Sequence, residues 1–168
     1  MNQKNKSCMS CFLHTMQRKP DAAAKILGSE NYHCIHGMVK FYQTAKGVLI
    51  SVEIFGLPSC DDSCKGAVHG FHIHSGECCS GNEQDPFADA KMHYNPCDCE
   101  HPYHAGDLPP LFADKGYAFS VVLTDRFTVK DIIGRTVIVH SDADDFTSQP
   151  SGNSGEKIAC GEIKPLCR

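Results

Sequence analysis

The sequence predicts an all-β protein, and three observations support that prediction. Apolar residues alternate with polar ones along several short runs, as in strands that bury one face. Turn-forming groups such as AKG, ADKG and PSGNSG separate these runs. No long stretch shows the period of an amphipathic helix. Short strands joined by such turns are typical of a β-sandwich or β-barrel.

The run GVLISVEIF, residues 47–55, gives the clearest alternation. Val48, Ile50, Val52 and Ile54 would share one apolar face, because successive side chains of a strand point to opposite sides. Four further runs predict strands: MVKFY (38–42), GFHIH (70–74), YAFSVVLT (117–124) and TVIVH (136–140).

Two long segments are predicted not to form strands. Residues 75–116 and 141–155 are rich in small and polar types, and loops of this length are usually functional or disordered. At the start of the chain, residues 1–20 predict a loose extension, so that the folded domain would occupy 21–168.

Composition excludes several classes of protein. The 168 residues are enough for one domain with a hydrophobic core, and 41% of them are hydrophobic and 21% charged. A net charge of −4 without a basic run argues against nucleic-acid binding. No apolar stretch approaches the ~20 residues of a membrane-spanning helix.

The N-terminal residues make a poor signal peptide. Their apolar centre is interrupted by Ser10 and His14, and no small-residue cleavage site follows. We therefore expect a cytoplasmic protein, with export as the alternative. The eleven cysteines weigh toward that alternative, because high cysteine counts are typical of secreted scaffolds or metal sites.

The run GFHIH separates two kinds of side chain. In a strand, His72 and His74 share one face while Phe71 and Ile73 share the other. One interpretation is a half-buried strand with two exposed histidines. The other is a pair of ligands for one metal ion, since imidazole binds zinc, copper, iron and nickel.

Further nitrogen and oxygen ligands favour the metal interpretation. His140 ends the run TVIVH and points away from the apolar pair Val137 and Val139. The segment HYNPCDCEHPYHAGDLPPL adds four potential ligands at close spacing: His93, His101, His104 and Asp107. Imidazole nitrogen and carboxylate oxygen at such spacing suit a tetrahedral zinc ion.

The motifs GFHIH, HYNP, HAGDLP, GRTVIVHSDADD and GNSGEKIACGEI, in this order, resemble the copper–zinc superoxide dismutase family, bacterial members in particular. The resemblance spans roughly residues 22–163. It implies an eight-stranded antiparallel Greek-key barrel, a sandwich of immunoglobulin-like type, with two long loops at the metal site. It also implies an oxidoreductase that disproportionates superoxide to dioxygen and hydrogen peroxide.

The resemblance assigns ligands for one copper and one zinc ion per chain. Copper would be bound by His72, His74, His93 and His140. Zinc would be bound by His93, His101, His104 and Asp107. Because His93 belongs to both sets, its imidazole would bridge the two ions after losing both ring protons.

The resemblance further implies roles for individual side chains. His93 would be catalytic, taking up and returning a proton, while copper carries the electron because zinc has no redox chemistry. Asp144 would connect a copper-bound histidine with a zinc-bound one. Lys157 replaces the family's arginine and would attract the superoxide anion. Nucleic acid and membrane are not expected partners, whereas a homodimer and a copper donor are left open.

A disulfide between Cys160 and the loop after GFHIH also follows from the resemblance. Cys78 and Cys79 compete for that bond, and the CSGN that follows favours Cys79. The other cysteines have no assigned role, namely Cys8, Cys11, Cys34, Cys60, Cys64, Cys97, Cys99 and Cys167.

Several of these cysteines still lie in suggestive patterns. Cys60 and Cys64 could pair, bind metal or remain free thiols, and Cys97 and Cys99 could compete with imidazole for zinc. The spacing of Cys8, Cys11 and His14 fits a soft-metal or redox site. His33 and His36 are expected to flank an edge strand.

Two other functions remain open from the sequence. A catalytically silent member of the same fold could act as a metal-binding or copper-handling module, but it would be expected to lack a copper histidine. A cysteine-rich extracellular binding scaffold leaves unexplained why the histidines oppose the apolar faces. The sequence therefore favours the enzyme.

Overall fold

The computed structural model describes residues 8–59 and 67–166. Its helices and strands, in chain order, are α1 (Cys8–Gln17), β1 (Ala22–Gly28), η1 (Glu30–Tyr32), β2 (His36–Thr44), β3 (Gly47–Phe55), β4 (Ala67–His69), β5 (Phe71–His74), η2 (Ala88–Ala90), β6 (Leu111–Ala113), β7 (Ala118–Thr124), α2 (Val129–Ile132), β8 (Thr136–His140) and β9 (Lys157–Pro165).

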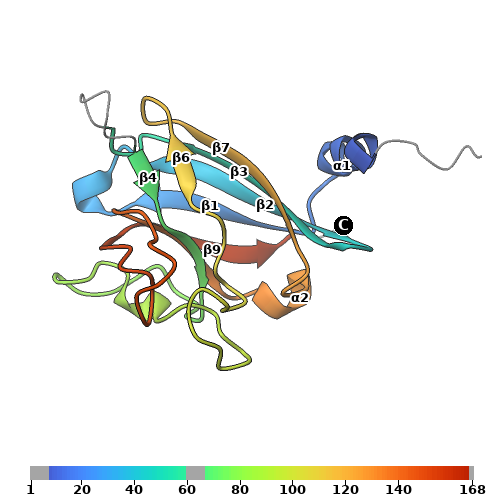
Figure 1. Ribbon diagram of the computed structural model, residues 1–168. Coiled ribbons are helices and arrows are strands. Elements are labelled where there is room, and N and C mark those ends of the chain that lie inside the picture. Colours follow the sequence, from blue (N-terminus) through green and yellow to red (C-terminus); the bar gives the residue numbers. More distant parts are fainter. Residues whose placement is uncertain (1–7, 60–66, 167–168) are drawn as a thin grey trace, which may run out of the picture.

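Antiparallel strands form one curled sheet that encloses the core, as predicted (Figure 1). The strand order in this sheet is β5-β8-β9-β1-β2-β3-β7, and β4 pairs separately with β6. In the described ranges there are nine strands; the run GFHIH forms β5, and the short strand β4 lies directly before it, separated by Gly70. The long loops gather at the lower side of the barrel in Figure 1, next to β9.

Strand alternation builds the core as the sequence predicts. On β3, Val48, Ile50, Val52 and Ile54 are all 0% exposed and belong to one apolar cluster. Burying a side chain of this size contributes about 1.5–3 kcal/mol relative to leaving it exposed. The inward faces of neighbouring strands complete the cluster, so the barrel interior is apolar and the polar ligands lie outside it.

The structure differs from the prediction at β2 and β6. β2 extends the predicted run 38–42 at both ends, and it lies between β1 and β3, so the expectation that His33 and His36 flank an edge strand is wrong. β6 lies inside the segment 75–116, which was expected to contain no strand. Pairing with β4 stabilises this short strand, and a three-residue run gives no periodic signal.

The helix α1 was not predicted within the loose extension. Its C-terminal end and the residue that follows contact β2, since Tyr42 Oη donates to the Met16 carbonyl at 3.4 Å and Arg18 donates to the Gln43 carbonyl at 2.9 Å. Residues 1–7 lie outside the described part, so the domain boundary at residue 20 stays a prediction. No helix in the described ranges is long and apolar enough to cross a bilayer.

Candidate metal centre

Two groups of side chains converge in the described structure. One consists of His72, His74, His93 and His140, and the other of His93, His101, His104 and Asp107. Within each group the potential ligand atoms all lie within 4.8 Å of one another, and every member is buried. The structure therefore brings together all seven residues that the sequence analysis assigned to the two metals. We call these groups the first set and the second set.

Strand geometry positions three members of the first set. Phe71 and Ile73 of β5 point into the core with 1% and 0% exposure, which directs His72 and His74 to the opposite face. Pairing of β5 with β8 aligns Phe71 with Val139, so His140 follows directly at the end of β8. The bland alternative of two exposed histidines is wrong, since His72 is 0% and His74 2% exposed.

A close backbone contact places the loop 93–107 against β5. The amide of Ile73 donates to the Gly106 carbonyl at 2.9 Å, and the Ile73 carbonyl accepts from Tyr94 at 2.8 Å. A side chain at Gly106 would lie 2.2 Å from the Ile73 oxygen, so only glycine permits this approach. The contact holds His93, His104 and Asp107 beside the strand that carries His72 and His74.

Four buried ring nitrogens in the two sets make no hydrogen bond: His72 Nδ1, His93 Nε2, His101 Nδ1 and His104 Nδ1. Burying a polar atom without a partner is costly, and such atoms in native proteins usually have an explanation. Each of these atoms belongs to a histidine of one or both sets. A metal ion in each set would satisfy them, so the donor atoms present fit two metal ions.

His93 presents one ring nitrogen to each set. Its Nδ1 lies 2.7 Å from Asp107 Oδ1 in the second set, while Nε2 is one of the nitrogens without a partner. The His72 and His93 ring centroids are only 4.0 Å apart. The His93 imidazole is therefore the physical link between the two sets.

The second set is organised around the Asp107 carboxylate. Asp107 Oδ2 accepts from the His104 amide at 3.0 Å and lies 3.1 Å from His101 Nδ1 and 3.3 Å from His104 Nδ1. Burial alone would raise the pKa of Asp107, but the hydrogen bond and charge of His93 outweigh it and lower that pKa. An ionised carboxylate among three imidazoles is a donor set typical of zinc.

Asp144 connects the two sets from outside. Its Oδ2 lies 2.7 Å from His72 Nε2 and its Oδ1 lies 2.9 Å from His101 Nε2, so each ring is oriented through the nitrogen opposite its unpartnered Nδ1. Burial would raise the pKa of Asp144, but hydrogen bonds from His72, the Phe146 amide and His101 hold it well below its usual range. The ionised carboxylate accepts from both rings at once.

In three histidines of the first set, burial lowers the pKa and so favours the neutral ring. Burial lowers the pKa of His72 and lowers that of His74 well below the ordinary value. Burial, reinforced by the charges of His72 and His93, lowers the pKa of His140 to about 3. Neutral imidazoles offer a lone pair for coordination at neutral pH.

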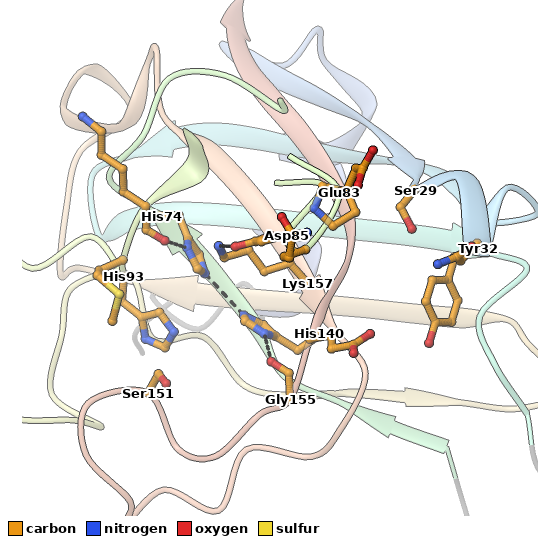
Figure 2. A pocket seen from close by; sticks show the side chains of 16 residues that line it. Ser29, Tyr32, His74, Glu83, Asp85, His93, His140, Ser151, Gly155 and Lys157 are labelled. Atoms are coloured by element: carbon orange, nitrogen blue, oxygen red, sulfur yellow. Dashed lines mark hydrogen bonds and ion pairs between the residues drawn. The ribbon is translucent and has the colours of Figure 1, made fainter. Parts of the chain in front are cut away.

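A pocket of about 420 Å³ opens onto the first set (Figure 2). Its lining includes His74, His93 and His140 of the first set, together with Lys157. Lys157 Nζ donates to Asp85 Oδ2 at 2.5 Å and to the Phe87 carbonyl at 3.2 Å. The residue predicted to attract an anion therefore lies at the mouth, but in an ion pair that sequence reasoning missed.

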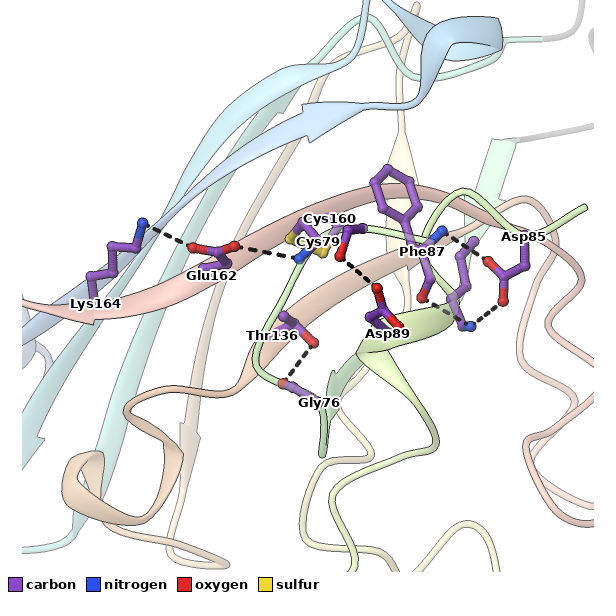
Figure 3. The surroundings of a disulfide bond; sticks show 11 residues. Gly76, Cys79, Asp85, Phe87, Asp89, Thr136, Cys160, Glu162 and Lys164 are labelled. Carbon is purple, nitrogen blue, oxygen red and sulfur yellow. Dashed lines mark hydrogen bonds and ion pairs between the residues drawn. A yellow bond between two sulfur atoms is a disulfide. The ribbon is translucent and has the colours of Figure 1, made fainter. Parts of the chain in front are cut away.

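The disulfide Cys79–Cys160 is present, with Cα atoms 5.7 Å apart (Figure 3). It packs with Phe87, Ala90 and Ile138 in a small apolar cluster on the outer face of β8 and β9. Cys78, the competing candidate, is an exposed free thiol. The bond anchors to β9 the loop that carries the Phe87 carbonyl bound by Lys157.

The other cysteines lie outside both sets. Cys34, Cys97 and Cys99 are exposed free thiols, so the predicted competition of Cys97 and Cys99 for zinc has no counterpart among the converging ligands. The predicted pairing or metal binding of Cys60 and Cys64 lies outside the described residues, as does Cys167. The same holds for the side chains of Cys8 and Cys11 on α1.

Two further contacts were not predicted from the sequence. His69 is buried, and its Nδ1 donates to the backbone carbonyl of His140 at 2.9 Å. Arg126 Nη1 donates to the carbonyls of His104 and Asp107. Both residues act on the backbone of distant segments, so neither spacing nor alternation gives a signal for them.

The comparisons with known proteins agree with this geometry. The sequence model of the family described as copper/zinc superoxide dismutase (SODC) matches residues 35–163. Superoxide dismutase [Cu-Zn] 2 of Aquifex aeolicus (strain VF5) is 34% identical over 159 residues, which are 85% of this chain and 86% of that protein. Superoxide dismutase [Cu-Zn] of Legionella pneumophila is 34% identical over 136 residues, covering 76% and 77% of the two chains.

A solved structure has the same fold. Cu/Zn superoxide dismutase from Brucella abortus superposes with a TM-score of 0.70 at 25% sequence identity. The match covers 85% of this chain and 99% of that one.

Proposed function

Because the chain belongs to the copper/zinc superoxide dismutase family, we propose that its two ligand sets act as one catalytic centre for superoxide. The reaction converts two superoxide anions and two protons into one dioxygen and one hydrogen peroxide. The first set would hold copper and the second zinc, one of each per chain. Bound copper supplies the one-electron chemistry, and zinc, which has no redox chemistry, supplies a fixed charge.

The shared position of His93 carries this proposal. Its Nδ1 lies 2.7 Å from the ionised Asp107 of the second set, whereas its Nε2 has no hydrogen-bond partner and the residue lines the pocket at the first set. Nε2 is thus placed to hold or release a proton beside the substrate while Nδ1 stays in the second set. A catalytically silent metal-binding module would have no need for a shared imidazole that opens onto a pocket.

Asp144 fixes the orientation of one histidine ring in each set. By accepting hydrogen bonds from His72 and His101, it fixes the proton of each ring on Nε2 and leaves each Nδ1 free for a metal. One carboxylate therefore orients one ligand of each set. We assign Asp144 a positioning role.

Lys157 is proposed to draw superoxide toward the first set. It lines the pocket with Lys91, while the carboxylates of Glu83, Asp85 and Glu156 line the same pocket. A positive group at the mouth raises the encounter rate of an anion, and an adjacent carboxylate reduces this effect. The ion pair with Asp85 therefore sets how much of the Lys157 charge the substrate meets.

The compartment and partners are part of this proposal. A structural disulfide such as Cys79–Cys160 supports the export alternative over the cytoplasmic expectation, because disulfides persist mainly in oxidising compartments. A homodimer and a copper donor are proposed as further partners by resemblance alone.

The test is metal analysis together with superoxide consumption on the same purified protein. After loading with both metals, we expect close to one copper and one zinc per chain and catalytic consumption of superoxide. His93→Ala should bind less of both metals and lose activity. Full zinc binding without copper retention or superoxide consumption would overturn the enzyme and indicate the silent module.

A further inference from the structure

We propose that Arg126 is a positioning residue for the second set, acting through the backbone of the turn from His104 to Asp107. The inference rests on the proposed function of that set as the zinc position. Arg126 lies between β7 and α2, far from the metal ligands in sequence. Its Nη1 donates to the His104 carbonyl at 3.2 Å and to the Asp107 carbonyl at 2.9 Å.

The turn that Arg126 contacts supplies two members of the second set, His104 and Asp107. The Asp107 amide donates to the His104 carbonyl at 3.2 Å, and the His104 amide donates to Asp107 Oδ2 at 3.0 Å. The guanidinium bonds the carbonyls at both ends of this turn. It therefore fixes the peptide planes from which the His104 and Asp107 side chains depart, and a metal site tolerates only small errors in ligand position.

Arg126 lies in the short connection between β7 and α2, which is anchored to the barrel on both sides. Its amide donates to Thr124 Oγ1 at 3.3 Å, and the next residue, Phe127, is buried in the core at 5% exposure. The capping box of Thr128 and Asp131 then begins α2. The guanidinium thus transmits the position of the barrel to the loop that carries the second set.

Because Arg126 is positively charged, a positioning role and a purely electrostatic role predict opposite changes in zinc affinity when it is removed. A cation near a metal site repels the metal ion, so an arginine acting only through its charge would weaken zinc binding, and removing it would tighten zinc binding. If Arg126 instead positions the ligands, its removal should weaken zinc binding. Groups that orient metal ligands typically change metal affinity by about 10–100-fold when removed.

Arg126→Gln and Arg126→Lys test the direction of this change in zinc affinity. Zinc affinity is measured by chelator competition in a His140→Ala background, which disables only the first set. We expect Arg126→Gln to weaken zinc binding by about 10–100-fold and Arg126→Lys to restore part of the loss. Cobalt(II) in the second set should show a changed visible spectrum in Arg126→Gln and a parent-like one in Arg126→Lys.

Arg18→Gln is the matched control. Arg18 also donates to a backbone carbonyl, that of Gln43 at 2.9 Å, but it lies away from both sets. Its loss should leave zinc affinity and the cobalt spectrum unchanged. Thermal unfolding of each metal-free variant reports whether the barrel is intact, and Arg126→Lys serves if Arg126→Gln does not fold.

Three outcomes would overturn the proposal: unchanged zinc affinity in Arg126→Gln, tighter zinc binding in that variant, or an equal loss in Arg18→Gln. The measurement uses zinc or cobalt alone and requires no turnover. A chain that binds zinc as expected but does not consume superoxide would overturn the proposed function and leave the role of Arg126 in place.

Discussion

At the scale of single residues, the ion pair of Lys157 and Asp85 decides what an approaching anion meets. Lys157 is largely covered, with a side chain 16% exposed, whereas Asp85 is 38% exposed at the same mouth. The carboxylate is thus the more accessible partner. Salt screens such exposed charges over a Debye length of about 8 Å at physiological ionic strength.

Asp85→Asn should raise the bimolecular rate with superoxide by about two- to tenfold at low salt, because it unmasks the Lys157 charge. The amide oxygen can still accept from the Phe87 amide, as Asp85 Oδ1 does at 3.0 Å. Rates are measured by pulse radiolysis across an ionic-strength series.

Asp89→Asn provides the charge-matched control, since Asp89 lies in the same loop but binds Ser80 Oγ at 2.6 Å. Lys157→Glu should lower the rate with metal content unchanged. An Asp85→Asn rate equal to that of Asp89→Asn at every salt concentration would contradict the neutralising role of Asp85.

Asp144→Asn should weaken at least one of the two ligand sets. A carboxylate accepts from His72 and His101 simultaneously, whereas an amide has one acceptor oxygen, so one ring loses its orienting bond. We expect affinity for at least one metal to fall by about 10–100-fold, measured by chelator competition. Asp142→Asn, whose carboxylate binds Ser141 Oγ, controls for charge, and parent-like affinity in Asp144→Asn would refute the positioning role.

At the scale of elements, the disulfide joins a long loop to a strand. Cys79 and Cys160 are separated by 81 residues, so their bond removes much freedom from the unfolded chain. Cys79→Ser should lower the free energy of unfolding by about 4 kcal/mol, measured by denaturant titration of the metal-free protein. Cys78→Ser should change it little, because Cys78 is exposed and unpaired; equal losses would show that the bond contributes nothing specific.

Strands with a strong local signal could be predicted from the sequence. β3 and β8 match their predicted ranges because each is a run of mostly β-branched and apolar residues with the two-residue period of a strand. β6 and α1 could not be predicted from the sequence. In the case of β6, a three-residue strand depends on its pairing with β4. Pairing between distant segments leaves no periodic trace in either one.

The same distinction holds within the site. Ligands such as His72 and His101 were identifiable because their residue types and spacing carry the chemistry. Asp85 and Arg126 were not, because each acts on a partner distant in sequence through contacts that any polar residue could have made elsewhere. The metal ligands could therefore be predicted from the sequence, whereas the groups that surround them could not.

At the scale of the whole molecule, metal removal should destabilise the barrel. The buried ring nitrogens without partners would be satisfied only in the metal-bound protein, and a ligand that binds only the folded state stabilises it. We expect the melting temperature to fall by about 10 °C or more on chelation, measured by scanning calorimetry. His93→Ala should show a smaller difference, and equal melting temperatures with and without metals in the parent would contradict metal binding at these sets.

The shared imidazole of His93 has a thermodynamic consequence for the whole molecule. Two binding positions that use one side chain cannot have independent affinities, so occupancy of one changes the affinity of the other by some coupling factor. Linkage requires this factor to be identical in both directions, whichever ion arrives first. The order of metal loading can therefore alter rates of assembly, but the final balance between half-filled and filled protein depends only on the two ion concentrations.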